Sequence, residues 1–128
     1  MVVDSSALLS IFYKEDDAEL IEAKMDRADR LFMSTPTLVE VWVSVLRKLG
    51  RDSAVELEEL VARLFIEAVD FNEQDVALAR EAYVTFGRSL HPAKLNLGDC
   101  FSYALAMRLG EPLLFKGNDF SQTDVLKA

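Results

Sequence analysis

The alternation of short apolar segments with helical segments predicts an α/β fold, with a central parallel sheet and helices on both of its faces. Four segments have the length and composition of short strands, and helices separate them. Strands joined through helices pair in parallel by right-handed crossovers, which places the helices on both faces. The chain has 128 residues, 51% of them hydrophobic, so we expect residues 1–128 to form a single domain with its own core.

The chain begins with a strand, two helices and a second strand. Met1–Val3 is a short apolar segment that ends at Asp4. Ser5–Tyr13 and Asp16–Ala28 follow as helices, the second with apolar residues at helical spacing. Leu31–Met33 is the second apolar strand. Because helices connect these two strands, we expect them to lie parallel in one sheet.

The next helix carries signals at both ends. It opens at Ser34 with hydroxyl side chains that can cap a helix, followed by Pro36, which the first turn tolerates. It runs to Leu49 and stops at Gly50, a typical residue at a helix C-terminus. Apolar residues cover more than one of its faces, which indicates burial on two sides. In so small a domain, the second apolar side suggests a protein partner.

The rest of the chain supplies three more helices and two more strands. Ser53–Ala68 carries an amphipathic stripe and leads into a third strand, Val69–Phe71. Glu73–Ser89 is a further helix, again with apolar residues on one face. Asp99–Leu109 is the last helix, and Pro112–Phe115 is the last strand.

The net charge of −8, from 14 basic and 22 acidic residues, disfavours loose attraction of the whole surface to a nucleic acid. It leaves room for a local basic patch, because the windows Val41–Arg51 and Ala82–Gly98 contain no Asp or Glu. Their cations are either candidate RNA contacts or solvated residues at helix ends. These candidates are Arg47, Lys48, Arg51, Arg88 and Lys94.

Cysteine usage and the N-terminal segment predict a cytoplasmic setting. The single cysteine, Cys100, excludes a disulfide framework within one chain and fits a reduced compartment. The segment MVVDSSALL has no basic stretch before its apolar run, so it does not read as a secretory signal. The apolar runs are too short to cross a membrane, and we expect no membrane contact.

Four acidic residues lie where the chain leaves a strand or begins a helix: Asp4, Glu40, Asp99 and Asp119. Ligands of parallel α/β sheets bind beyond the carboxyl ends of the strands, and we expect these residues to converge there. Carboxylates that Lys and Arg do not neutralise favour a divalent cation. Mg²⁺ prefers oxygen ligands and can activate water for attack at phosphorus, so metal-dependent cleavage of a phosphodiester is the leading hypothesis. Ser6 is a candidate to orient a metal-bound water.

Each acid also has a purely structural explanation. Asp4 can cap the first helix, and Glu40 can close a capping box with Thr37. Asp99 can complement a helix N-terminus, and Asp119 can simply form a turn. The shared sheet edge expected for all four is what favours the functional explanation.

Other chemistries have weaker support. The lone His91 has no second histidine or cysteine at ligand spacing, which argues against zinc. Cys100 lies at a helix start, but no catalytic partner is evident. A receiver-like signalling domain is a further alternative, because Asp70 follows a strand and Lys116 ends another. The pair of acids that such a domain needs after its first strand is absent.

Four segments, in this order and spacing, resemble bacterial PIN-domain ribonucleases of the VapC toxin type: VVDSSALLSIF, STPTLVEVWVSVLRKLG, HPAKLNLGDCFSYALA and PLLFKGNDFSQTDV. The resemblance covers essentially the whole chain. It implies a three-layer α/β/α sandwich with a short central parallel sheet and an acidic Mg²⁺ or Mn²⁺ site that hydrolyses RNA. It also implies the toxin component of a toxin–antitoxin pair, restrained by a cognate antitoxin, and a homodimer.

Position by position, the acids of the family fall on the four acids named above, with Asp4, Asp99 and Asp119 as metal ligands. Many relatives carry another acid two residues before the last position, where this chain has Gly117, and Asp124 is an alternative fourth acid. A non-catalytic PIN-like binding module, which keeps the fold without turnover, is the runner-up hypothesis. Retention of all four acids argues against it.

Overall fold

The computed structural model describes residues 1–128 as four strands and six helices. The strands are β1 (Val2–Val3), β2 (Leu31–Ser34), β3 (Ile66–Val69) and β4 (Leu113–Leu114). The helices are α1 (Ser5–Phe12), α2 (Ala18–Met25), α3 (Thr35–Leu49), α4 (Arg51–Arg63), α5 (Glu73–Phe86) and α6 (Leu97–Leu109). None of these helices has the length and apolar character needed to cross a membrane.

The four strands form one parallel sheet in the order β3-β2-β1-β4. The two-residue strand β1 lies between β2 and β4, with Val2 opposite Phe32 on one side and Leu113 on the other. Just beyond β1, the Asp4 amide donates to the Leu114 carbonyl oxygen at 2.9 Å. The first acid of the chain is therefore fixed at the carboxyl edge of the sheet by backbone pairing.

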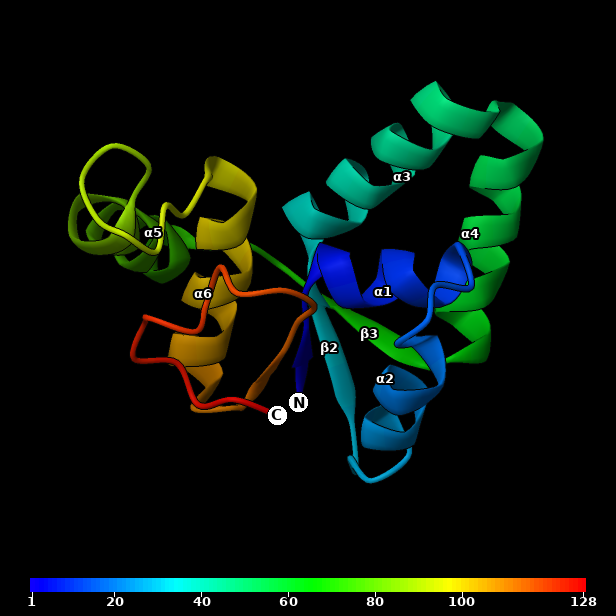
Figure 1. Ribbon diagram of the computed structural model, residues 1–128, viewed down its shortest axis with the longest axis horizontal. Coiled ribbons are helices and arrows are strands. Elements are labelled where there is room, and N and C mark those ends of the chain that lie inside the picture. Colours follow the sequence, from blue (N-terminus) through cyan, green and yellow to red (C-terminus); the bar gives the residue numbers. More distant parts are fainter.

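Alternate residues of β1 and β4 enter two separate apolar cores. Val3 and Leu114 pack with α1, α2, α3 and α4, whereas Val2 and Leu113 pack with α5 and α6. Figure 1 shows the corresponding arrangement, with α5 and α6 on one side of the strands and the other four helices on the opposite side. The predicted three-layer α/β/α sandwich is confirmed.

Two predicted boundaries between α4 and α5 are wrong. The helix expected to reach Ala68 ends at Arg63, and the strand expected at Val69–Phe71 is Ile66–Val69. The cause is Phe65, whose φ of +52° ends the helical turn and starts the strand early. The sequence gives little warning of this, because a bulky residue rarely adopts the left-handed region.

Hydrogen bonds from outside the helix shorten two other predicted helices. The helix expected at Asp16–Ala28 begins at Ala18 because Asp17 accepts a hydrogen bond from Ser10 Oγ at 2.5 Å. The helix expected to reach Ser89 ends at Phe86, whose carbonyl oxygen accepts from the Leu95 amide at 2.9 Å. That bond closes the loop that leads toward α6.

Candidate active site at the carboxyl edge of the sheet

Asp4 holds one carboxylate oxygen in place and leaves the other free. Its Oδ2 atom accepts from the Ser6 amide at 2.9 Å and from Ser6 Oγ at 2.5 Å, so Asp4 does cap α1. Ser6 Oγ in turn accepts from the Lys116 amide at 3.0 Å. The side chain of Asp4 is buried, and its Oδ1 atom has no hydrogen-bond partner. A buried carboxylate oxygen without a partner is costly unless a cation or water satisfies it.

Asp99 is held in the first turn of α6 by a capping box. Its Oδ2 atom accepts from the Asn96 amide at 2.8 Å, and the Asn96 side chain accepts from the Asp99 amide at 2.9 Å. Burial is the main cause that raises the pKa of Asp99 to about 7. The negative charges of Asp4, Asp119 and Glu40 raise the pKa further, against the lowering effect of the Asn96 amide. Asp99 is therefore a buried acid among other acids.

Glu40 reaches this cluster from the surface of α3. Desolvation of its carboxyl group, followed by the charge of Asp4, raises the pKa of Glu40 above its usual range. The expected capping box with Thr37 is wrong: α3 begins at Thr35, which places Thr37 inside the helix, and its Oγ1 atom is buried without a partner. Helix capping therefore does not explain why Glu40 lies close to the other acids.

Asp119 lies in the exposed turn that follows β4, and its charge acts on Asp99. The alternative fourth acid, Asp124, accepts a hydrogen bond from the Tyr103 hydroxyl at 2.8 Å. Asp124 does not act on the pKa of Asp99, whereas Asp119 does. The geometry thus favours Asp119 as the fourth member of the cluster.

None of the four clustered acids forms an ion pair with Lys or Arg. Lys116, the nearest candidate along the chain, pairs instead with Glu15 at 2.5 Å and Asp17 at 3.1 Å. These contacts tie the segment after β4 to the turn between α1 and α2. They also occupy the lysine that a receiver-like domain would direct at its phosphorylated aspartate.

The donor set suits a hard divalent cation, although the carboxylates do not form a closed cage. All available donors are oxygen atoms, and Asp4 Oδ1 is an unsatisfied buried one. No three His, Cys, Asp or Glu side chains are spaced to hold an ion between them. Mg²⁺ commonly binds through one or two carboxylates and keeps several waters, which matches this open arrangement.

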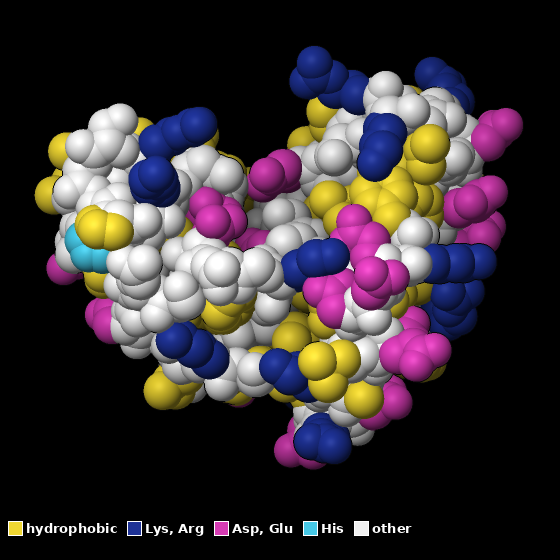
Figure 2. All heavy atoms as spheres, viewed as in Figure 1, with side chains coloured by type: hydrophobic (Ala, Val, Ile, Leu, Met, Phe, Trp, Pro, Cys, Tyr) yellow, Lys and Arg dark blue, Asp and Glu magenta, His cyan; other side chains and the backbone are white.

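Basic side chains lie on both sides of the cleft that contains the acids. Figure 2 shows this cleft between the two lobes of the molecule, with acidic side chains at its base and Lys or Arg on each rim. On one side of the cleft, α3 residues that include Glu40, Arg47 and Lys48 line a groove of about 610 Å³. Arg51 begins α4, and Arg88 and Lys94 lie in the loop between α5 and α6. All five predicted cations are exposed.

A PIN-domain family model matches residues 1–126. The chain belongs to the PIN-domain family. Among curated PIN-domain relatives, ribonuclease VapC42 of Mycobacterium tuberculosis is 42% identical over 135 residues, covering 100% of this chain and 98% of that protein. Ribonuclease VapC30 of the same organism is 40% identical over 125 residues, covering 98% and 95%. The predicted resemblance to VapC ribonucleases is confirmed.

Solved structures show the same PIN fold at low sequence identity. VapC20 of M. tuberculosis, a toxin that cleaves the sarcin–ricin loop, superposes with a TM-score of 0.80 at 15% identity, covering 99% of this chain and 97% of that one. VapBC2 of Rickettsia felis, bound to a DNA fragment from its promoter, gives a TM-score of 0.76 at 14% identity, covering 98% and 94%.

One positioning residue of this PIN domain was absent from the sequence-based prediction. Asn96 fixes the orientation of Asp99, so that one carboxylate oxygen of the buried acid is bound to backbone. The signal was present in the sequence, because Asn-x-x-Asp directly before an apolar run is a capping-box pattern. Ser6 donates its O–H to Asp4, so it positions that carboxylate. Its expected role toward a metal-bound water stays a prediction.

Proposed function

We propose that this single-domain PIN protein is an Mg²⁺- or Mn²⁺-dependent endoribonuclease that acts as the toxin of a toxin–antitoxin pair. The observation that carries the proposal is the cluster of Asp4, Glu40, Asp99 and Asp119, which has no cationic partner. Within it, burial first and then the charges of the other three acids raise the pKa of Asp99 to about 7. The ribonuclease names of relatives at about 40% identity over the full chain support the reaction class.

In this proposal Asp4, Asp99 and Asp119 would hold the metal, one or two of them directly and the rest through bound waters, because no three acids are spaced to bind one ion together. When bound, the ion supplies positive charge that activates water and stabilises the leaving oxygen during attack at phosphorus. Asp4 contributes its free Oδ1 atom, while Ser6 fixes the other oxygen. Asp99 contributes the oxygen that Asn96 does not bind. Glu40, whose pKa is raised, is placed to accept a proton at the edge of the cluster.

The RNA backbone is proposed to lie in the cleft, with its phosphates against the basic rims. A protein of net charge −8 gains little from general attraction, so binding depends on these local cations. Arg47 and Lys48 stand in the same groove as Glu40. Lys48 Nζ also lies 4.2 Å from the ring centre of Tyr13, a cation–π contact that steadies its position.

Metal binding and RNA cleavage together test the proposed function. We expect Mg²⁺ or Mn²⁺ at about 100 times its dissociation constant to stabilise the fold by about 2.7 kcal/mol relative to EDTA. The Asp4→Asn variant should lose most of this gain and reduce RNA cleavage by at least about 100-fold. The matched control is Asp29→Asn, an exposed acid before β2 at the other end of the strands. Identical melting curves with and without saturating metal would contradict the proposed site.

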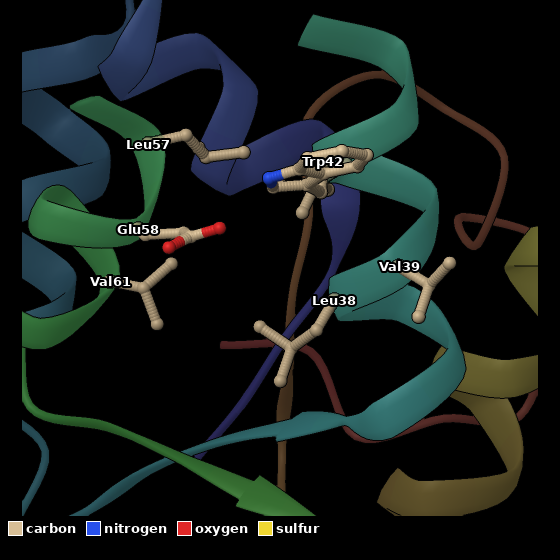
Figure 3. A pocket seen from close by; sticks show the side chains of 7 residues that line it. Leu38, Val39, Trp42, Leu57, Glu58 and Val61 are labelled. Carbon is tan, nitrogen blue, oxygen red and sulfur yellow. The ribbon is translucent and has the colours of Figure 1, made fainter. Parts of the chain in front are cut away.

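The antitoxin is proposed to dock on the apolar pocket between α3 and α4. Figure 3 shows Leu38 and Trp42 of α3 on the side toward Leu57, Glu58 and Val61 of α4, with Val39 beside them on α3 and farther from α4. The pocket has a volume of about 370 Å³ and is mostly apolar. It lies on the helix whose second apolar side suggested a protein partner. The unpaired acids of the cleft add a receptor for a basic antitoxin side chain that competes with the metal.

A second exposed apolar face is proposed to form the homodimer contact. It lies on α5 and the start of α6 and is lined by Phe71, Val76, Tyr83, Val84, Leu97 and Phe101. Charges placed on the two faces should have different effects. Val84→Glu should shift light-scattering mass to the monomer and preserve antitoxin affinity, whereas Val39→Glu should weaken antitoxin affinity and preserve the dimer. The opposite result, or no change in either variant, would refute this assignment of the faces.

A further inference from the structure

Glu40 and the first turn of α6 are packed closely at one point. An ideal Cβ atom built on Gly98 would lie 2.5 Å from both carboxylate oxygens of Glu40. Real Cβ atoms essentially never approach an oxygen so closely. The Glu40 carboxylate therefore occupies the space that any other residue at this position would fill with its side chain.

Nothing in the backbone itself requires glycine here. Gly98 lies in the first turn of α6, and it is not among the three glycines with positive φ, which are Gly50, Gly110 and Gly117. Alanine is a better helix former than glycine. The three atoms nearest to such a methyl group all belong to the end of the Glu40 side chain. Glycine at this position costs helix stability and makes room for a carboxylate.

We propose that Gly98 is a positioning residue that sets where the Glu40 carboxylate lies relative to Asp99. Resting on the proposed ribonuclease function, this inference gives a role to a residue that has no side chain with which to bind a metal or RNA. Gly98 directly precedes Asp99, so the surface against which Glu40 rests belongs to the same helical turn as the buried acid. An added methyl group displaces the Glu40 carboxylate toward solvent and leaves Asp99 in its capping box.

A matched pair of variants separates this role from a general effect on the helix. α5 and α6 both begin with Asn, two further residues and Asp, and position 74 of α5 corresponds to position 98 of α6. Gln74→Ala and Gly98→Ala therefore place the same side chain at the same point of two similar helix starts. Gln74 is exposed, and its neighbour Asp75 contacts Arg108 at the opposite end of α6 from Asp99.

The expected result for Gly98→Ala is an enzyme that is at least as stable as the wild type and slower. The unfolding temperature in EDTA should be unchanged or higher. The kcat for RNA cleavage should fall by about 10- to 100-fold, as a misplacement of about 1 Å does in other active sites, with KM unchanged. Gln74→Ala should keep the wild-type kcat. In a Glu40→Asp background, whose shorter side chain no longer reaches α6, Gly98→Ala should have little further effect on kcat.

Three outcomes would overturn the inference. The first is a wild-type kcat in Gly98→Ala. The second is a loss of kcat from Gly98→Ala that is equally large whether position 40 is Glu or Asp. The third is that Gly98→Ala unfolds whereas Gln74→Ala stays folded. Metal-free crystal structures keep this test separate from the proposed function. If the wild type cleaves no RNA, a displaced Glu40 carboxylate in Gly98→Ala still supports the positioning role, and an unmoved one refutes it.

Discussion

The starts of α5 and α6 have the same local design, yet only one of them belongs to the acidic site. In α5 the Asn72 side chain accepts from the Asp75 amide, and the Asp75 carboxylate accepts from the Asn72 amide. In α6 Asn96 and Asp99 make the same two bonds. Both aspartates are buried, with exposed fractions of 1% and 8%. A capping box alone therefore does not distinguish a structural aspartate from a candidate metal ligand.

The difference lies in what each aspartate meets from the rest of the chain. Asp75 Oδ1 accepts from Arg108 Nε at 2.6 Å, and Arg108 also donates to the Asp70 carbonyl oxygen at 3.0 Å. Asp99 meets Asp4, Glu40 and Asp119 instead, and no cation. Burial with a guanidinium gives a structural ion pair, whereas burial among carboxylates leaves a charge that an external cation can relieve.

The largest expected effect concerns the charge on Asp99. Its carboxyl group titrates at 3.8 in the unfolded chain and at about 7 in the folded protein. Between pH 3.8 and about 7 the unfolded chain releases this proton while the folded protein keeps it. The folded state therefore loses stability as pH rises through this range, and above about 7 it carries the full cost of a buried charged carboxylate. Asp99→Asn removes that cost, because asparagine carries no charge. In EDTA it should exceed the wild type in unfolding free energy by up to about 4 kcal/mol at pH 8, and by much less at pH 4.

Urea unfolding of both proteins at several pH values measures this difference directly. Asp99→Asn should also abolish RNA cleavage, so that the variant gains stability and loses activity. If the two stability–pH curves run parallel, ionised Asp99 does not destabilise the folded protein. Asp99 and Asp75 would then not differ in the way described above.

The second effect has the opposite sign and concerns Asp75. Asp75→Asn leaves the mostly buried Arg108 guanidinium without its carboxylate, because the Arg108 side chain is only 16% exposed. We expect a loss of about 2–3 kcal/mol in unfolding free energy, somewhat below the value for a fully buried pair. Metal-dependent stabilisation should persist, because Asp75 lies outside the cluster. Loss of the metal effect in this variant would mean that the two helix starts are functionally coupled.

The smallest effect sharpens the comparison at the two asparagines. Asn72→Ala and Asn96→Ala each remove one side-chain cap, and each should cost about 1 kcal/mol of stability. Only Asn96→Ala should also lower kcat for RNA cleavage, because Asn96 orients the Asp99 carboxylate. Thermal melts and cleavage rates on the same two proteins test this, and equal cleavage rates would remove Asn96 from the positioning network.

The sequence was sufficient to predict that Asp4 and Asp99 lie at one edge of the sheet. It was insufficient to predict the side-chain contacts between helices that are far apart in the sequence. Asp4 follows the first strand and Asp99 opens a helix, and the parallel fold brings both to one edge as predicted. The pairing of Arg108 with Asp75 joins positions 33 residues apart, and no local pattern indicates it. The fit of Glu40 against Gly98 is likewise a property of two packed helices, since a glycine in a helix start has many ordinary explanations.

The placement of β1 between β2 and β4 has a consequence for the order in which the acidic cluster is assembled during synthesis. Asp4 is made before the other three acids, but its backbone is fixed by Leu114, and Asp119 emerges later still. A chain still attached to the ribosome lacks one edge of its sheet and one of its four clustered acids until residues 113–119 have been made. Pairing over so long a separation is slow to form. The order of synthesis thus delays assembly of the acidic cluster until all four strands of the sheet have been made.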